Sequence, residues 1–210
     1  MIEIPKSALT RIIIPKEKFY EVGDVSGKIK RIFIDEVEKV TLFAVIAPRT
    51  LNITGKTYEE LDILEVRLKL GEVSLKVLET IDSIIPRPVL FCIVRPSGDI
   101  KYAISYKEPK TKEANKSKII QYYETSWKPS TITIKGASVE SIYINFIKQI
   151  DPNFDPSMPI SDAVQKTKET AKIKNDIDKI NSQIRNEPSI AKKQELARER
   201  FALEQQRNEL

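Results

Sequence analysis

Residues 61–94 read LDILEVRLKLGEVSLKVLETIDSIIPRPVLFCIV, and this stretch decides the fold. Its first part is rich in branched apolar residues and predicts a strand over residues 61–70. Its middle part repeats apolar residues at helical spacing and predicts a short helix over residues 75–85. Its last six residues, 89–94, are all apolar, which is typical of a central strand buried on both faces. We therefore expect a strand–helix–strand unit within a larger sheet.

The sequence downstream of this unit predicts more strands and a helix. Residues 96–99, Pro-Ser-Gly-Asp, form a turn signal, and residues 100–106 alternate as a hairpin partner would. Two more strands are expected at residues 119–127 and 132–134. A helix is expected next, with its apolar face at Val139, Ile142, Tyr143, Phe146 and Ile150.

The sequence upstream predicts a helix and one short extended segment. Ser26 is a suitable N-cap, and a helical face follows it at Ile29, Ile32, Phe33, Val37 and Val40. Residues 12–14, three isoleucines ahead of Pro15, predict an edge strand or a buried arm. The whole order predicts an α+β fold with a mixed β-sheet and helices mainly on one face.

The C-terminal part has a different composition. Residues 151–159 contain three prolines, which exclude regular structure. We therefore predict a core domain over residues 1–150, a linker over 151–160 and a charged helical arm over 161–210. The arm carries one apolar seam at coiled-coil spacing and three leucines seven residues apart. This pattern predicts a helical hairpin that mediates self-association or partner binding. Its residues are Ile173, Ile177, Ile180, Ile184, Leu196, Leu203 and Leu210.

Composition excludes several kinds of chemistry. The chain has no histidine, so it has no Ser-His-Asp or Cys-His triad and no histidine metal site. Its glycines form no phosphate-binding loop, and we expect no cofactor and no bound metal. One cysteine, Cys92, lies in an apolar run and is expected to be a buried thiol. The absence of a signal peptide and of any long apolar stretch predicts a cytoplasmic protein with no membrane contact.

The charge distribution suggests an acidic partner for the core. The chain has 35 basic and 30 acidic residues, and 11 of each lie from Asp151 onward. The core therefore has 35 − 11 = 24 basic and 30 − 11 = 19 acidic residues and carries the whole excess of five. This excess is compatible with nucleic acid as a partner.

A lysine-rich stretch is the first candidate site. Tyrosines and Trp127 lie near it in the sequence, and lysines among aromatics can bind phosphates and stack on bases. The alternative is a solvated loop on a hairpin whose aromatic residues belong to the core, and this simpler interpretation is favoured. The candidate nucleic-acid-binding residues are Lys101, Lys107, Lys110, Lys112, Lys116 and Lys118.

A loose metal-nuclease pattern is the second candidate site. Asp62, Glu65 and Lys69 lie on one expected strand, and nucleases hold magnesium with an acid followed by an acid-x-lysine pair. Here Arg67 stands where the lysine is expected, and a cross-strand ladder of salt bridges explains the pattern equally well. A divalent-metal-dependent nuclease using Asp62 and Glu65 is therefore the alternative function, and a catalyst is not the favoured interpretation.

Six segments spread over nearly the whole chain share a characteristic order and spacing. They are residues 4–7, 14–20, 47–53, 85–91, 104–107 and 122–127. Together they resemble a prokaryotic family, domain of unknown function 4391.

The resemblance implies a role beside restriction–modification genes in antiviral defence, with a helicase or methyltransferase as partner. We therefore expect a non-catalytic accessory or adaptor protein that binds DNA or a DNA-processing enzyme and forms a homo-oligomer or hetero-complex through its arm. A scaffold with no nucleic-acid contact is a further alternative.

Overall fold

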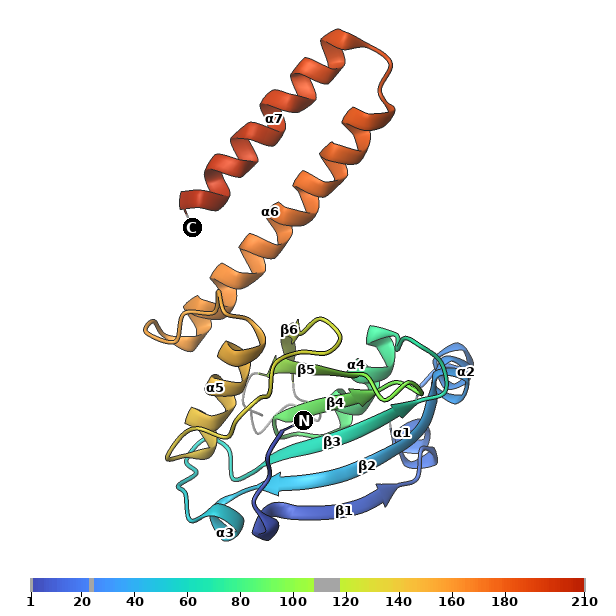
Figure 1. Cartoon of the computed structure of the whole chain (residues 1–210), viewed down its shortest axis with the longest axis vertical. Helices are drawn as coiled ribbons and strands as arrows, with labels where there is room; N and C mark the ends of the chain where they lie inside the picture. The colour runs from blue at the N-terminus through green and yellow to red at the C-terminus, as the bar shows by residue number, and fades with distance from the viewer. Residues whose placement is uncertain (1, 23–24, 108–117, 210) are drawn as a thin grey trace. The chain divides into compact units, whose positions relative to one another are not determined.

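A computed structural model gives the fold (Figure 1) and describes residues 2–22, 25–107 and 118–209. The chain divides into two compact units, Met1–Pro152 and Asn153–Leu210. The first unit, called the core here, is an α+β structure on one sheet, and the second is built on two long helices. Within the described residues, no helix is long and apolar enough to cross a membrane.

The strands of the described residues form one mixed sheet in sequence order. β3 and β4 are parallel, and all other neighbouring pairs are antiparallel. The helix α4 (Leu75–Ile84) connects β3 to β4, so the expected strand–helix–strand unit is confirmed. The strands are β1 (Leu9–Ile14), β2 (Val37–Ile46), β3 (Leu61–Leu68), β4 (Val89–Val94), β5 (Ile100–Lys107) and β6 (Ile119–Glu124).

Helices cover the two faces of the sheet unequally. Leu64, Phe91 and Ala103 point to the face that packs on three helices, α1 (Glu17–Val22), α2 (Gly27–Glu36) and α4. Figure 1 shows these helices together, away from α5 (Val139–Ile150). On the other face, Tyr106 of β5 stacks on Tyr143 of α5, with 6.5 Å between the ring centroids. Two further short helices are η1 (Lys6–Ala8) and α3 (Pro48–Leu51). The α+β prediction is therefore confirmed.

Strand β2 lies where part of a helix was expected. The helical spacing of apolar residues continued through Val37 and Val40, but α2 ends at Glu36. Both valines are fully buried in the core that α1, α2 and α4 cover. β2 itself pairs with β1 on one side and β3 on the other. These partners are distant in sequence, and their hydrogen bonds outweigh the local helical pattern.

The expected strand at residues 132–134 is also wrong. The side chain of Gln149 on α5 accepts from the Thr133 backbone N–H at 2.9 Å and donates to its carbonyl at 2.9 Å. This side chain satisfies both backbone groups of Thr133, so the segment needs no neighbouring strand. The strand expected at residues 119–127 is shorter than predicted, because β6 ends at Glu124 and does not reach Trp127.

The second unit is the predicted pair of helices. α6 (Ile160–Asn186) and α7 (Ile190–Glu209) pack side by side, and Pro188 lies in the short connection (Figure 1). Three seam residues, Ile173, Ile177 and Ile180, are buried. We call this pair the α6–α7 hairpin, and it confirms the expected local form of the arm.

Candidate functional site

An ionic cluster lies at one end of the core sheet, where β3 and β4 begin and β5 ends. The register places Asp62 of β3 beside Val89 of β4, and the antiparallel β5 finishes at the same end. Three basic and three acidic side chains meet there. The ionic cluster consists of Arg49, Glu60, Asp62, Asp82, Arg87 and Lys107.

The outer half of the ionic cluster is a chain of three ion pairs. Glu60 accepts from Arg49 at 2.7 Å with one carboxylate oxygen and from Arg87 at 2.8 Å with the other. Arg87 also donates from Nε to Asp62 at 2.7 Å. The Arg49 side chain is 66% exposed and that of Arg87 is 37% exposed, whereas Asp62 is buried. Two guanidinium groups are therefore held in place at the surface by carboxylates beneath them.

The inner half of the ionic cluster is a buried ion pair. Lys107 Nζ lies 2.6 Å from Asp82 Oδ1, and both side chains are at most 1% exposed. The other oxygen of Asp82 accepts from the hydroxyls of Tyr122, at 2.7 Å, and Ser105. The Asp82 carboxylate is thus bound by one ammonium and two hydroxyl donors, which is the condition for keeping a charge inside a protein.

Lys107 also caps the end of α4. Its ammonium donates to the carbonyls of Asp82, Ile85 and Arg87 at 2.7–2.8 Å. The last carbonyls of a helix have no partner within the helix and attract a positive charge. Lys107 therefore fixes the end of α4 and the turn after it, which also sets the position of Arg87.

Burial opposes the charged form of the three buried members of the ionic cluster, Asp62, Asp82 and Lys107. Burial raises the pKa of Asp82, and the Lys107 ammonium acts in the opposite direction. Burial likewise lowers the pKa of Lys107, and Asp82 counters it. The pKa of Asp62 is also raised by burial and is held back by Arg87. Each buried charge consequently depends on its named partner, as burial without pairing would neutralise it.

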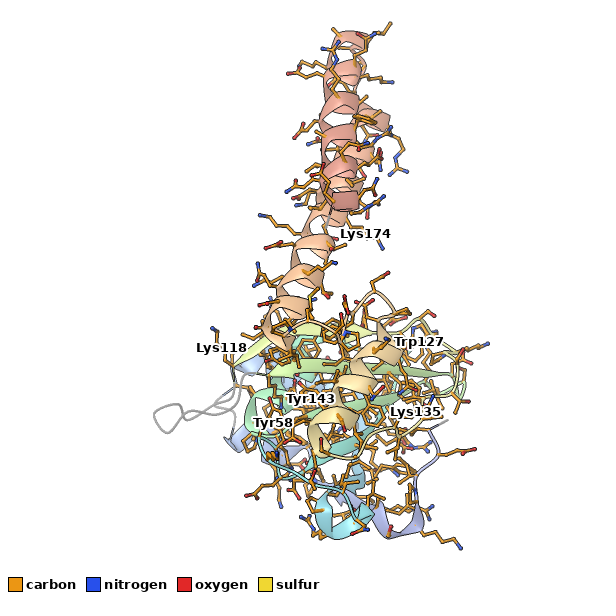
Figure 2. All side chains as sticks on the ribbon, turned by 90° about the vertical axis from the view of Figure 1, so that its left-hand side faces the viewer. Tyr58, Lys118, Trp127, Lys135, Tyr143 and Lys174 are labelled. Carbon is orange, nitrogen blue, oxygen red and sulfur yellow. The ribbon has the colours of Figure 1, made fainter. Side chains whose placement is uncertain are left out.

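The backbone of Lys107 is anchored as firmly as its side chain. Its N–H donates to the Tyr143 hydroxyl at 3.1 Å, and its carbonyl accepts from the Tyr58 hydroxyl at 2.8 Å. The rings of Tyr58 and Tyr143, which are labelled in Figure 2, meet edge to face with centroids 5.5 Å apart. The end of β5 is therefore held firmly beside Arg87.

Glu140 holds the loop that carries Tyr58. One oxygen of its carboxylate accepts from the backbone N–H groups of Lys56, Thr57 and Tyr58 at 2.7, 2.6 and 3.0 Å. Burial raises the pKa of Glu140, but these donors outweigh it and lower the pKa to about 2. Lys56 is thus kept at the same end of the sheet as the ionic cluster.

The predicted basic stretch is only partly a surface feature. Lys107 was expected on a basic loop, and this is wrong, because its side chain is buried and paired with Asp82. Lys101 is half-buried and pairs with Glu124 at 2.7 Å. Lys118 is exposed and projects at the edge of the core (Figure 2). The other three lie outside the described residues: Lys110, Lys112 and Lys116.

The aromatic residues near this stretch mostly belong to the core. Tyr102, Tyr106 and Tyr123 are buried, and the Tyr122 hydroxyl is bonded to Asp82. Trp127 is covered by the guanidinium of Arg95, which lies 3.6 Å from the ring centroid. These rings therefore offer no open row of faces on which bases could stack.

The nuclease pattern does not come together in space. Asp62 and Glu65 are three residues apart on β3, so their side chains point to opposite faces of the sheet. Asp62 pairs with Arg87, and Glu65 pairs with Arg67 at 2.8 Å. Lys69 lies beyond the end of β3 and is exposed. Over the described ranges no group of three or more acidic or cysteine side chains could hold a metal ion.

Sequence reasoning missed most of the ionic cluster. Arg49, Glu60, Asp82 and Arg87 were not candidates, because they lie on four different segments with no common spacing. One signal was available. Four of the segments that carry the family resemblance contribute residues to this end of the sheet: 47–53, 85–91, 104–107 and 122–127.

Comparisons with known proteins identify a family. No curated protein matches the chain, and no solved structure does either. A family model described as Domain of unknown function (DUF4391) matches residues 2–206, nearly the whole length. The chain therefore belongs to the DUF4391 family.

Proposed function

We propose that the core binds the phosphate backbone of DNA at the end of the sheet that holds the ionic cluster, as a non-catalytic accessory protein. The observation that carries the proposal is the pair of surface guanidinium groups, Arg49 and Arg87, fixed by Glu60 beside the base of the lysine-rich stretch. Exposed Lys56, in the loop before β3, and exposed Lys118, next to the Ile119 that pairs with Lys107, lie at the same end. We call these four residues the basic rim.

The chemistry of the basic rim suits phosphates. A guanidinium offers five N–H donors in a fork that matches phosphate oxygens. Within the described part of the chain, one ion pair of Arg49 is seen, to Glu60, so other donors of its fork are available to a ligand. Because the nearby tyrosines are buried, we infer contacts to the backbone and little reading of base sequence.

The wider role follows from the family resemblance and the arm. We infer that the protein acts in the cytoplasm, in a restriction–modification type of defence against foreign DNA, beside a helicase or methyltransferase. The α6–α7 hairpin would supply assembly, as a homo-oligomer or in a hetero-complex. The balanced charge of the arm, 11 basic and 11 acidic residues from Asp151 onward, supports a role in assembly over one in DNA binding.

The test is the salt dependence of DNA binding by the full chain. Fluorescence anisotropy with a labelled duplex is measured from low to physiological salt for the wild type and two triple variants. The rim variant carries Arg49→Gln, Lys56→Gln and Lys118→Gln. The control variant carries Lys28→Gln, Arg31→Gln and Lys76→Gln, which remove the same charge from α2, which leads into the start of β2, and from the first turn of α4, which follows the end of β3.

The two variants should differ in slope as well as in affinity. Each phosphate contact contributes about 0.9 to the slope of log K against log salt, so losing three contacts should reduce the slope by about 2.7. The control should lose affinity only weakly. If both variants lost the same affinity for DNA, the DNA would bind at another surface. If the wild type did not bind DNA even at low salt, the proposal would fail and the scaffold with no nucleic-acid contact would be favoured.

A further inference from the structure

The α6–α7 hairpin exposes two large apolar side chains, and both lie on α7. Ile190 is 76% exposed and Phe201 is 59% exposed. No residue of α7 is buried among those described, although α7 packs along α6. The hairpin therefore covers the seam of α6 and leaves apolar surface on α7.

The exposed residues form one line on α7. Eleven residues separate Ile190 from Phe201, and at 3.6 residues per turn they lie about 20° apart around the helix. Ala197, which is half-buried, lies about 20° to the other side of Ile190. Leu196 and Leu203, which are also half-buried, lie about 120–140° away. We call Ile190, Ala197 and Phe201 the outer stripe.

We propose that the outer stripe binds the outer stripe of a second copy of this chain, with the two α7 helices antiparallel. Reversing the helix places Ile190 of one copy against Phe201 of the other at both ends, with the small Ala197 near the middle. The outer stripe has a bulky residue at each end and a small one between them. Two copies related by a two-fold axis therefore fit each other along this stripe. Small residues near the crossing allow two helices to approach closely.

Charge favours a second copy over an acidic or basic partner. The arm has equal numbers of basic and acidic residues from Asp151 onward, so two arms do not repel each other. Antiparallel helices also oppose their dipoles favourably. The assembly surface is then not the seam expected from the sequence, because Ile173, Ile177 and Ile180 are already buried in the described structure.

Light scattering of the full chain tests the stoichiometry. We expect a dimer for the wild type and a monomer for Phe201→Glu at the same concentration, with circular dichroism showing unchanged helix content. Leu70→Glu is the matched control, because Leu70 is 62% exposed in the core; this variant should remain a dimer. A wild-type monomer at all concentrations, or a Phe201→Glu dimer, would overturn the proposal.

Cysteine cross-linking tests the orientation. In the antiparallel pair, the two Ala197 positions are offset by about 4.5 Å along the axis and the two Gln205 positions by about 28 Å. A disulfide needs Cα atoms within about 7 Å. Ala197→Cys should therefore form a covalent dimer on oxidation and Gln205→Cys should not. Covalent dimers of Gln205→Cys, or none of Ala197→Cys, would contradict the arrangement.

The native cysteine does not interfere with this readout. Cys92 is buried in β4, and burial raises the pKa of its thiol to about 12. Both measurements report mass and covalent linkage, so they succeed or fail independently of DNA binding by the basic rim.

Discussion

Replacing Lys107 by methionine removes the only ammonium that the described structure pairs with Asp82 while keeping the apolar stem. The change leaves the Asp82 carboxylate buried, with hydroxyl donors but no positive partner. It also removes the donor of three carbonyls at the end of α4 and in the following turn. We expect this single change to be among the most destabilising in the core.

The magnitude follows from the contacts. Removing one partner of a buried ion pair costs about 3–5 kcal/mol. Each carbonyl left without a donor adds up to about 1–3 kcal/mol, reduced where the turn at residues 85–88 relaxes or takes up water. We expect a loss of about 4–6 kcal/mol, a large part of the about 5–15 kcal/mol that stabilises a typical domain.

The assay is urea unfolding followed by tryptophan fluorescence. Trp127 is the one tryptophan of the chain and lies in the core, so its signal reports the core without the arm. The control is the double variant Lys107→Met with Asp82→Asn, which removes both charges and keeps an acceptor for the Tyr122 hydroxyl. We expect the double variant to be at least about 2 kcal/mol more stable than Lys107→Met alone.

At acidic pH, the free energy of unfolding of Lys107→Met should come closer to that of the wild type. Burial raises the pKa of Asp82, and without Lys107 no ammonium counters this. When folding raises the pKa of a carboxyl group, the group favours the folded protein most at a pH below its unfolded pKa of 3.8. The folded protein then becomes less stable as pH rises from 3.8 toward the folded pKa. A loss below about 1 kcal/mol at neutral pH, or a double variant less stable than the single one, would refute this account of the ion pair.

Two further predictions concern α5 and the loop that it holds. The pKa of Glu140 is lowered to about 2 from 4.5, so its contribution is present above pH 4.5 and is lost as pH falls toward 2. Thermal unfolding should show Glu140→Gln less stable at neutral pH and level with the wild type near pH 2; a constant difference would contradict this. Gly136→Ala should destabilise the core by about 1–3 kcal/mol, because φ is +148° and a Cβ would lie 2.4 Å from Ser141 Oγ. Gly71→Ala, where nothing lies within 4 Å, should be nearly neutral in the same urea assay.

Short-range patterns allowed several elements to be predicted. The apolar run of β4, the period of α4 and α5, and the capping residue Ser26 of α2 all act over a few residues. The spacing of the isoleucines and of the leucines likewise predicted the hairpin of the arm. These features are local, and the structure confirms them.

The site could not be predicted in the same way. Lysine in a polar stretch is usually solvated, and nothing near Lys107 in the sequence shows that Asp82 and the end of α4 lie against it. Arg49, Glu60 and Arg87 likewise meet only because β2, β3 and β4 are neighbours in the sheet. The strand β2 was missed for the same reason, since both of its partners are distant in sequence.

The sequence by itself determined α4, α5, the start of α2 and the two helices of the arm, together with the buried central strand, the break before the arm and the exclusion of histidine chemistry. Tertiary structure alone decided which charges are buried, which carboxylates share a face and which apolar residues of the arm stay exposed. The physical reason is that periodicity and capping depend on neighbours within about one or two helical turns. Burial and ion pairing depend instead on side chains that the fold brings together from distant segments.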